Sequence, residues 1–299
     1  WSDVLTHAPN LSPTVGREVY ETDKIRQYHR ENQDSKWDEQ LKLGEARAMR
    51  PTMPKSMYRA MDAADVEVYG RRLALFLNYN LIDHVPKSDG FFSLNLREME
   101  RLTWQLMPAT TNNDLPALKD FMSVSHIINP TNPVAWIARD TFLPLITAGQ
   151  KPIFMPDDAA LREVMGPAFA PAKFVCLPPQ ESAFIKAADA VPAKILSRHF
   201  EAQRIEAEVE SPAPTMLVVA QSFYHLWRPY VDGKPTRLCR ANYAFQALEV
   251  PAGKHQVTLI YEDRNLFYGA ILSLISLLGC AAIWFRSRSA TKAFGAVAR

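Results

Sequence analysis

The most distinct pattern along the chain is an apolar run near its C-terminal end, with no charged side chain from Leu266 to Phe285. At a rise of about 1.5 Å per residue, a helix of this length crosses a hydrocarbon layer of about 30 Å. Tyr268 and Trp284 lie near its two ends, where aromatic rings favour the headgroup region. The run predicts a transmembrane helix over residues 265–286. A buried helix of a soluble core is the alternative, although such helices rarely lack charge on every face.

The charges on either side of this run predict its orientation. Four basic side chains and no acidic one follow it: Arg286, Arg288, Lys292 and Arg299. By the positive-inside rule, residues 287–299 form a basic cytoplasmic tail, and the bulk of the chain is extracytoplasmic at the cell membrane. A tail-anchored protein with a cytosolic body is the alternative, but its basic tail would have to cross the membrane.

Between residues 191 and 264 the pattern is typical of β-structure alone. Stretches of about five to eight alternating residues are separated by Pro, Asp-Gly or Pro-Ala-Gly turns, which predicts a small antiparallel β-sandwich. Asp232-Gly233 suits the tip of a tight hairpin, and Ala252-Gly253 after Pro251 suits the next one. The last strand, His255 to Tyr261, leads into the apolar run within a few residues. The sandwich is therefore expected to lie against the membrane surface.

Upstream of residue 191 the pattern mixes helices and strands. Residues 1–65 are rich in charge and poor in periodic apolar positions, so loops and short helices are expected there. Residues 66–190 predict a mixed α/β region, with a strand or short helix over Leu73–Tyr79 and a turn at Ser88-Asp89-Gly90. The expected fold class is α+β, in which this mixed region is followed by the antiparallel β-sandwich and one C-terminal transmembrane helix.

Two helices of the mixed region are predicted from their spacing. The first runs from about Asn95 to Leu106 and places four apolar side chains on one face: Leu96, Met99, Leu102 and Leu106. The second begins near Ala159, with Asp157 or Asp158 as its N-terminal cap. The first helix is expected to pack on a core.

Composition and charge narrow the class of protein. With 47% hydrophobic and 22% charged residues the chain is globular, and 299 residues suggest about two domains plus the anchor. A net charge of +2, without a dense basic stripe, argues against a nucleic-acid partner. The chain begins WSDVLTHAPNLSP, without an initiator Met or a signal-like segment, so we expect either a removed signal or the C-terminal piece of a longer polytopic protein.

Three cysteines add little to this picture. Cys280 lies in the apolar run, which leaves Cys176 and Cys239 in the body. The two could form a disulfide in an oxidising compartment, or they could simply be buried thiols. The second reading is the commoner one for two cysteines far apart in sequence.

The segment YHLWRPYVDGKPTRLCRANYAFQALEVPAGKHQVTLIYE, followed by the apolar run, resembles the C-terminal end of the YfhO-like bacterial membrane proteins. Five features carry the resemblance in this order: Trp227, Val231–Pro235, Arg240–Asn242, Pro251–His255 and Tyr261. The similarity is looser upstream, in DFMSVSHIINP and the segment around MPDDAALREVMGP, and weak before about residue 65.

This resemblance implies a many-pass membrane protein that transfers sugars from lipid-phosphosugar donors in cell-envelope glycan modification. In such proteins the presumed catalytic acids lie in loops between N-terminal membrane helices, so the chemistry would belong to a part outside this chain. The implied partners are the lipid bilayer and a lipid-linked sugar or an envelope glycan. A membrane-anchored, non-catalytic carbohydrate- or protein-binding module is the alternative, because the D-G-K and P-A-G-K-H turns also resemble small PEGA-type envelope domains.

The chain itself offers few groups for catalysis. The carboxylate pairs Asp157-Asp158 and Glu262-Asp263 fall at a helix start and at the membrane boundary, where capping and solvation explain them. No two of the seven histidines are spaced four residues apart, and no nucleotide or nucleophile fingerprint occurs. We therefore expect no catalytic site, no metal site and no cofactor in this chain.

A sugar-binding surface is the milder possibility. Five residues of the sandwich are candidates: Tyr224, Trp227, Asp232, Arg240 and Asn242. The aromatic rings could stack on sugar rings, and the polar side chains could donate or accept hydrogen bonds. The structural alternative is that the Trp belongs to the core and that the Asp-Gly and Asn residues form turns.

Overall fold

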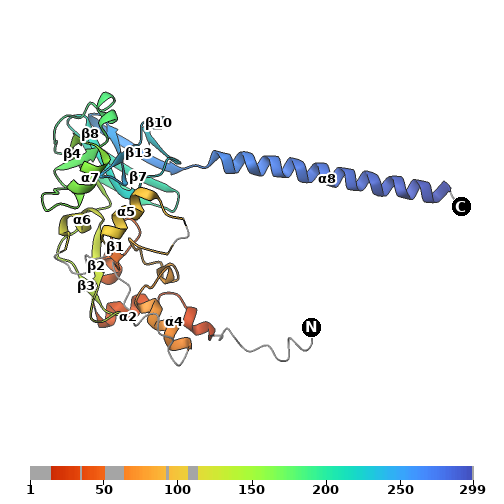
Figure 1. Ribbon diagram of the computed structural model, residues 1–299, viewed down its shortest axis with the longest axis horizontal. Coiled ribbons are helices and arrows are strands. Elements are labelled where there is room, and N and C mark those ends of the chain that lie inside the picture. Colours follow the sequence, from red (N-terminus) through yellow and green to blue (C-terminus); the bar gives the residue numbers. More distant parts are fainter. Residues whose placement is uncertain (1–14, 34–35, 51–63, 92–93, 107–113, 298–299) are drawn as a thin grey trace.

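The structure, a computed structural model, describes residues 15–33, 36–50, 64–91, 94–106 and 114–297. Residues 1–14 and 51–63 of the predicted N-terminal segment, and Arg299 of the basic tail, lie outside this range. A two-lobed body carries a single long helix, α8 (Arg264–Val297), that projects away from it (Figure 1). The chain is α+β, with helices, antiparallel and mixed sheets, and one apolar C-terminal helix.

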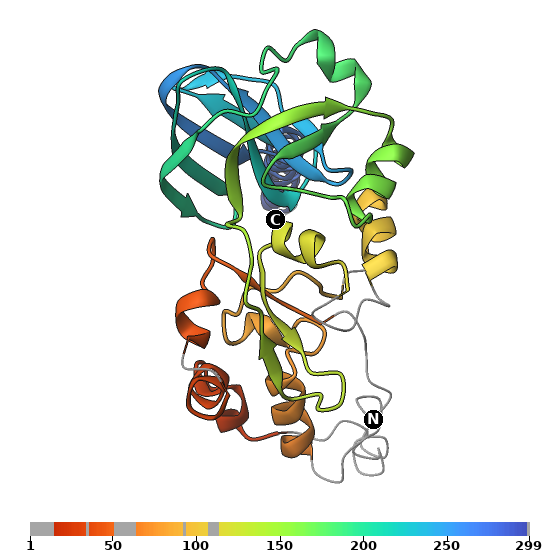
Figure 2. The same ribbon diagram turned by 90° about the vertical axis from the view of Figure 1, so that its left-hand side faces the viewer.

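The N-terminal lobe is built on a small sheet in the order β1-β2-β3, seen below the sandwich in Figure 2. Its strands are β1 (Arg47–Met49), β2 (Val124–Ile128) and β3 (Trp136–Ala138), with β1 and β2 parallel. The helical elements around it are η1 (Arg17–Tyr20), α2 (Lys24–Asn32), α3 (Trp37–Gln40), α4 (Ala64–Leu73) and η3 (Tyr79–Leu81). Trp37 is fully buried at the centre of this lobe, where its ring stacks on that of His29.

The segment Leu73–Tyr79 is neither the strand nor the short helix that the sequence predicts. Helix α4 ends at Leu73, and the following residues form turns in which Leu75 and Leu77 have positive φ. The Nζ atom of Lys87 donates to the carbonyl oxygens of Leu75 and Leu77, at 2.7 and 2.6 Å. A buried lysine from a distant segment therefore stabilises a backbone path that local pattern could not predict.

The larger lobe is a sandwich of two five-stranded sheets. The open sheet has the order β10-β9-β13-β7-β6 and is antiparallel throughout. Its strands are β6 (Lys194–Phe200), β7 (Arg204–Ser211), β9 (Trp227–Val231), β10 (Lys234–Pro235) and β13 (Gly253–Tyr261). One of its faces packs on the partner sheet, so its strands alternate between buried and exposed positions.

The covered sheet has the order β11-β12-β8-β4-β5. Its strands are β4 (Ile146–Phe154), β5 (Phe174–Leu177), β8 (Thr215–Ser222), β11 (Cys239–Ala241) and β12 (Phe245–Val250). The sandwich thus begins at β4 rather than at residue 191, because β4 and β5 pair in parallel and need the helical crossover between them. That crossover gives residues 146–177 a mixed α/β pattern in the sequence.

Helices cover the outer face of the covered sheet. They are α5 (Arg97–Leu106), α6 (Pro116–Phe121) and α7 (Asp157–Val164), and a short helix η4 (Pro179–Ala183) follows β5. The predicted helix near residues 95–106 is confirmed as α5, with Leu102 and Leu106 buried and Met99 packed against the same core. Cys176 and Cys239 are buried free thiols of this core, and burial raises the pKa of each to about 12. The alternative of two unpaired buried cysteines is therefore the correct one.

Helix α8 follows the last strand after only two residues, Glu262 and Asp263. Its segment Arg264–Trp284 is long and apolar enough to cross a membrane, and it is exposed along its length. This exposure distinguishes it from the helix of a soluble core, whose apolar faces are covered.

Candidate functional site

The Asp232-Gly233 pair forms a hairpin tip, as predicted. Val231 pairs with Lys234, and the two residues between them have positive φ of 50° and 73°, as a two-residue primed turn requires. One Asp232 oxygen accepts a hydrogen bond from Nδ1 of His255 at 2.6 Å, and the other accepts the Gln256 backbone N–H at 2.9 Å. The hydrogen bond between them lowers the pKa of Asp232 and raises that of His255. The Asp232 carboxylate is therefore engaged within the sheet.

The Pro251-Ala252-Gly253 segment is not the second hairpin that the sequence predicts. Strand β12 before it belongs to the covered sheet and β13 after it to the open sheet, so the chain crosses from one sheet to the other. Gly253 has a φ of 118°, a conformation that glycine adopts without steric cost. The sequence correctly predicts a turn at these residues. It does not predict that the strands on either side belong to different sheets, because a turn motif does not determine strand pairing.

The two aromatic candidates belong largely to the sandwich interior. Trp227 is 7% exposed and packs its ring edge-to-face on Tyr261 at 5.7 Å. Tyr224 stacks on the same tyrosine at 6.2 Å between ring centroids. Both rings therefore pack between the two sheets. For Trp227 this is the core position that the structural alternative predicts.

The two remaining candidates lie on β11 and in the turn that follows it, and both have partners nearby. Nη2 of Arg240 donates to both carboxylate oxygens of Asp157, at 2.8 and 2.6 Å. Asn242 is buried with a positive φ of 45°, and its Oδ1 accepts the backbone N–H of Cys176 at 2.9 Å. The five candidate residues thus fall into separate groups with separate partners, and the structure does not bring them together.

The two carboxylate pairs have structural partners as well. Helix α7 begins at Asp157 after Pro156 and has no side-chain cap, so the predicted capping by Asp157 or Asp158 is wrong. Asp157 instead joins α7 to β11 through Arg240. At the other pair, Oδ1 of Asp263 accepts the backbone N–H groups of Asn265 and Leu266, at 3.0 and 3.2 Å, and so caps α8.

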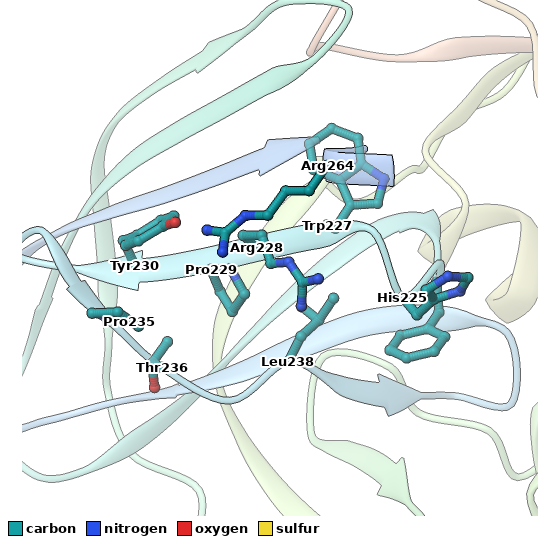
Figure 3. A pocket seen from close by; sticks show the side chains of 10 residues that line it. His225, Trp227, Arg228, Pro229, Tyr230, Pro235, Thr236, Leu238 and Arg264 are labelled. Atoms are coloured by element: carbon teal, nitrogen blue, oxygen red, sulfur yellow. The ribbon is translucent and has the colours of Figure 1, made fainter. Parts of the chain in front are cut away.

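A cleft of about 490 Å³ opens at the end of the open sheet where α8 begins (Figure 3). It lies along β9 and the segment that leads from β10 to β11. The side chains that matter for its chemistry are Arg228, Tyr230, Thr236, Arg264, His225 and Trp227. Figure 3 shows Arg264 reaching from the start of α8 toward β9, and Arg228 extending toward Leu238. Of the five predicted site residues, Trp227 is the one that lines this cleft.

Inward- and outward-pointing side chains alternate along β9, which explains why the cleft combines charged and apolar surface. Trp227, Pro229 and Val231 point inward, whereas Arg228 and Tyr230 point to the outer face. The Arg228 guanidinium has no hydrogen-bonding or ionic partner among the residues that the structure describes. Arg264 forms an ion pair with Glu262 at 3.5 Å, and its side chain remains 67% exposed. The cleft therefore carries positive charge that the described residues neutralise only in part.

A second cleft of about 410 Å³ adjoins the first and shares Arg264 with it. It is lined by Glu262, Asp263, Arg264, Phe267 and Tyr268, from the two-residue connection and the first turns of α8. The rings of Phe267 and Tyr268 are each 64% exposed. Positive charge on the sandwich is thus continuous with exposed aromatic surface on the helix.

Sequence reasoning missed Arg228 and Arg264 for an identifiable reason. In the sequence, Arg264 is one of the charged residues just before the apolar run, and Arg228 follows the candidate Trp227 directly. The available signal was the alternation W-R-P-Y-V of β9, which places the arginine and tyrosine on the face opposite to the tryptophan.

The part of the chain that the structure describes contains no group of three or more His, Cys, Asp or Glu side chains that could hold a metal ion. No protein-family model matches the chain, and no curated protein matches it. The YfhO-like resemblance, and the function that it implies, therefore remain predictions.

Proposed function

We propose that this chain is the extracytoplasmic C-terminal part of a YfhO-like membrane protein that takes part in lipid-linked sugar transfer in the cell envelope. The sugar-transfer chemistry belongs to membrane-embedded parts outside this chain. The body described here lies on the outer membrane surface, anchored by α8 with its C-terminus in the cytoplasm. Its role is to present a rigid surface to lipid-linked donors or envelope glycans.

The observation that carries this proposal is the connection between the sandwich and α8. Only Glu262 and Asp263 separate β13 from the helix, and both are held in place. The Glu262 backbone N–H donates to the Leu226 carbonyl at 3.0 Å, and Asp263 caps the helix. A rigid two-residue connection keeps the foot of the sandwich within a few ångströms of the bilayer surface, where lipid-linked sugars expose their headgroups.

A deletion in the source organism tests the proposed function. Cells that lack the gene are expected to lose a sugar modification from an envelope glycan and to accumulate the corresponding lipid-linked sugar, as measured by mass spectrometry of extracted glycans and lipids. Complementation with the full-length gene restores both, whereas a gene truncated after residue 263 does not. An unchanged glycan profile with no accumulated donor would contradict the proposal.

The orientation has its own test. A cysteine at position 298, introduced as Ala298→Cys, is expected to stay unlabelled by a membrane-impermeant maleimide in intact cells and to react after permeabilisation. The matched control is Lys234→Cys in the exposed hairpin, which reacts in intact cells. Labelling of position 298 in intact cells would place the C-terminus outside and overturn the assignment.

The non-catalytic envelope module is the second candidate, and one observation favours it. Within the described residues, one carboxylate of each pair has a structural role, Asp157 in an ion pair with Arg240 and Asp263 as a helix cap, as a module with a purely structural body would show. The deletion experiment distinguishes the two functions. Loss of surface attachment of a glycan or protein, without accumulation of a lipid-linked sugar, would favour the module.

A further inference from the structure

We propose that the cleft between β9 and the start of α8 binds the phosphate group of a membrane lipid, held between the guanidinium groups of Arg228 and Arg264. This inference rests on the proposed function, because it takes the foot of the sandwich to lie in the outer headgroup layer. It goes further by naming the ligand chemistry, a phosphate monoester or diphosphate on an apolar tail, and the residues that recognise it.

The first step of the argument is the charge of the cleft. Several other arginines of the body are paired with acids at close range, as in Arg240–Asp157 and Arg237–Glu181, each at 2.6 Å. Arg228 has no such partner among the described residues, and Arg264 has a single acid at 3.5 Å. Two guanidinium groups in one cleft repel each other, and an anion between them removes that repulsion. Arginine is also the side chain best suited to bind phosphate oxygens in pairs.

The second step is the depth of the cleft relative to the membrane. Arg264 is the first residue of α8, and the uncharged run begins two residues later at Leu266. A charged side chain at that position reaches the headgroup layer, which is where the phosphate of a lipid resides. A lipid carries its phosphate in the headgroup layer, whereas a soluble phosphate is distributed through the aqueous phase. We therefore infer that the ligand is a lipid.

The third step is the surroundings of the two arginines. The hydroxyl groups of Tyr230 and Thr236 line the cleft and have no hydrogen-bonding partner among the described residues. They can donate to further phosphate oxygens or to the first sugar of a headgroup. The exposed rings of Phe267 and Tyr268 line the adjoining cleft and offer apolar surface for the lipid tail as it descends along α8.

The acids near the cleft set the selectivity. Glu262 and Asp263 lie beside Arg264 in the second cleft, and Asp263 is occupied by its backbone hydrogen bonds. A lipid with a zwitterionic headgroup brings no net charge, so it compensates the arginines less well than a phosphate monoester does. We therefore expect phosphate monoesters and diphosphates to be preferred over phosphatidylcholine.

Lipid retention by the purified full chain tests the inference. The chain is reconstituted in phosphatidylcholine nanodiscs that contain a few mole per cent of phosphatidic acid or of a polyprenyl phosphate, and native mass spectrometry counts the lipids retained per chain. We expect at least tenfold enrichment of both phosphate lipids over phosphatidylcholine. Each of Arg228→Gln and Arg264→Gln is expected to lower the enrichment about threefold, through loss of charge-assisted hydrogen bonds, and the double variant to abolish it.

The controls separate the sources of the phosphate and the role of charge. Arg204→Gln is the matched control, because Arg204 lies across β13 from the Arg228 position, is paired with Glu206 at 2.6 Å and lines neither cleft. It is expected to retain lipids as the parent chain does. Arg228→Lys keeps the charge but not the paired donors, so partial retention is expected. Inorganic phosphate at millimolar concentration should not displace the lipid; displacement would show a site for free phosphate instead and overturn the lipid assignment.

Two further results would overturn the inference. One is equal retention of phosphate lipids and phosphatidylcholine by the parent chain, and the other is undiminished enrichment in a double variant that melts at the parent temperature. These failures differ from failure of the proposed function. If the deletion strain loses the glycan modification but the purified chain shows no lipid enrichment, the proposed function stands and the lipid site is ruled out. If the chain enriches phosphate lipids but the deletion strain has an unchanged glycan profile, the lipid site stands and the proposed function is ruled out.

Discussion

The two sheets of the sandwich have five strands each, yet they are buried in different ways. In β7 of the open sheet, Ile205, Ala207 and Val209 are buried, and the residues between them face outward. In β8 of the covered sheet, six consecutive residues, Thr215–Ala220, are all buried, because the second sheet lies on one face and helices α5, α6 and α7 on the other. Most of the stabilising burial therefore belongs to the covered sheet, and the open sheet keeps a free face on which unpaired charge is tolerated.

The largest expected effect comes from a cavity in the covered sheet. Phe245 is fully buried and packs edge-to-face on Phe121 at 4.8 Å. Phe245→Ala should lower the free energy of unfolding by about 3–5 kcal/mol, measured by urea denaturation of the full chain in detergent. The matched substitution on the solvent face of the open sheet, Thr258→Ala, should change it by no more than about 0.5 kcal/mol. Equal losses at the two positions would break the comparison.

A polar contact inside the covered sheet comes next. Asn242→Ala leaves the buried N–H of Cys176 without an acceptor and keeps a positive φ that alanine adopts reluctantly, so a loss of about 1–3 kcal/mol is expected. Asn242→Gly also leaves the Cys176 N–H without an acceptor, but glycine adopts the positive φ easily, so this variant should lose less stability. Retention of lipid by Asn242→Ala should be unchanged below its melting temperature. A stable variant that lost a ligand would instead restore Asn242 as a binding residue.

The difference between the sheets also explains how far the sequence could predict the fold. The open sheet produces a clean alternation, and the strand leading into the apolar run, the Asp232-Gly233 tip and helix α5 were all predicted from pattern alone. The covered sheet produces continuous apolar runs such as TMLVVA, from which the elements packed on either face of the strand cannot be predicted. Its parallel strands β4 and β5 are joined through α7. The sandwich therefore starts far upstream of residue 191, where the sequence pattern changes to β-structure alone.

The hairpin of the open sheet should show a smaller effect. A Cβ atom at Gly233 would meet nothing within 4 Å, so the cost of Gly233→Val is conformational and amounts to about 1 kcal/mol or more for a β-branched residue at positive φ. Gly233→Asn is the control, since Asn tolerates this conformation, and it should be nearly silent. Thermal unfolding of both variants measures the difference. A Gly233→Val protein as stable as the parent would mean that the tip does not constrain the open sheet.

The smallest expected effect is a pH dependence of the same hairpin. The raised pKa of His255 makes its contribution fully present below its ordinary value of 6.5 and lost as the pH rises through the raised value. The lowered pKa of Asp232 makes its contribution present above 3.8 and lost as the pH falls through the lowered value. The pair therefore stabilises the open sheet most between these limits. In Asp232→Asn, the NMR titration of His255 should shift to lower pH, and an unchanged titration would show that the pair does not form.

The candidate site was harder to predict than the fold because it depends on contacts between distant elements. Residue type singled out Tyr224, Trp227, Asp232, Arg240 and Asn242, and each of them has a packing or hydrogen-bonding partner in the body. Arg228 and Arg264 differ in that they have little to bind within the described residues. They lie on different elements, and only the register of β9 against β13 and the short connection to α8 bring them to one cleft.

The two-residue connection between β13 and α8 also determines how the body encounters its ligands. Two extended residues span at most about 7 Å, so the end of β13 stays close to the start of α8. In the membrane setting proposed above, encounter becomes a search in two dimensions, by lateral diffusion of lipids within one leaflet. Occupancy of the cleft then depends on the mole fraction of the ligand among its neighbouring lipids rather than on its bulk concentration. A scarce lipid would reach the cleft only as fast as the leaflet mixes.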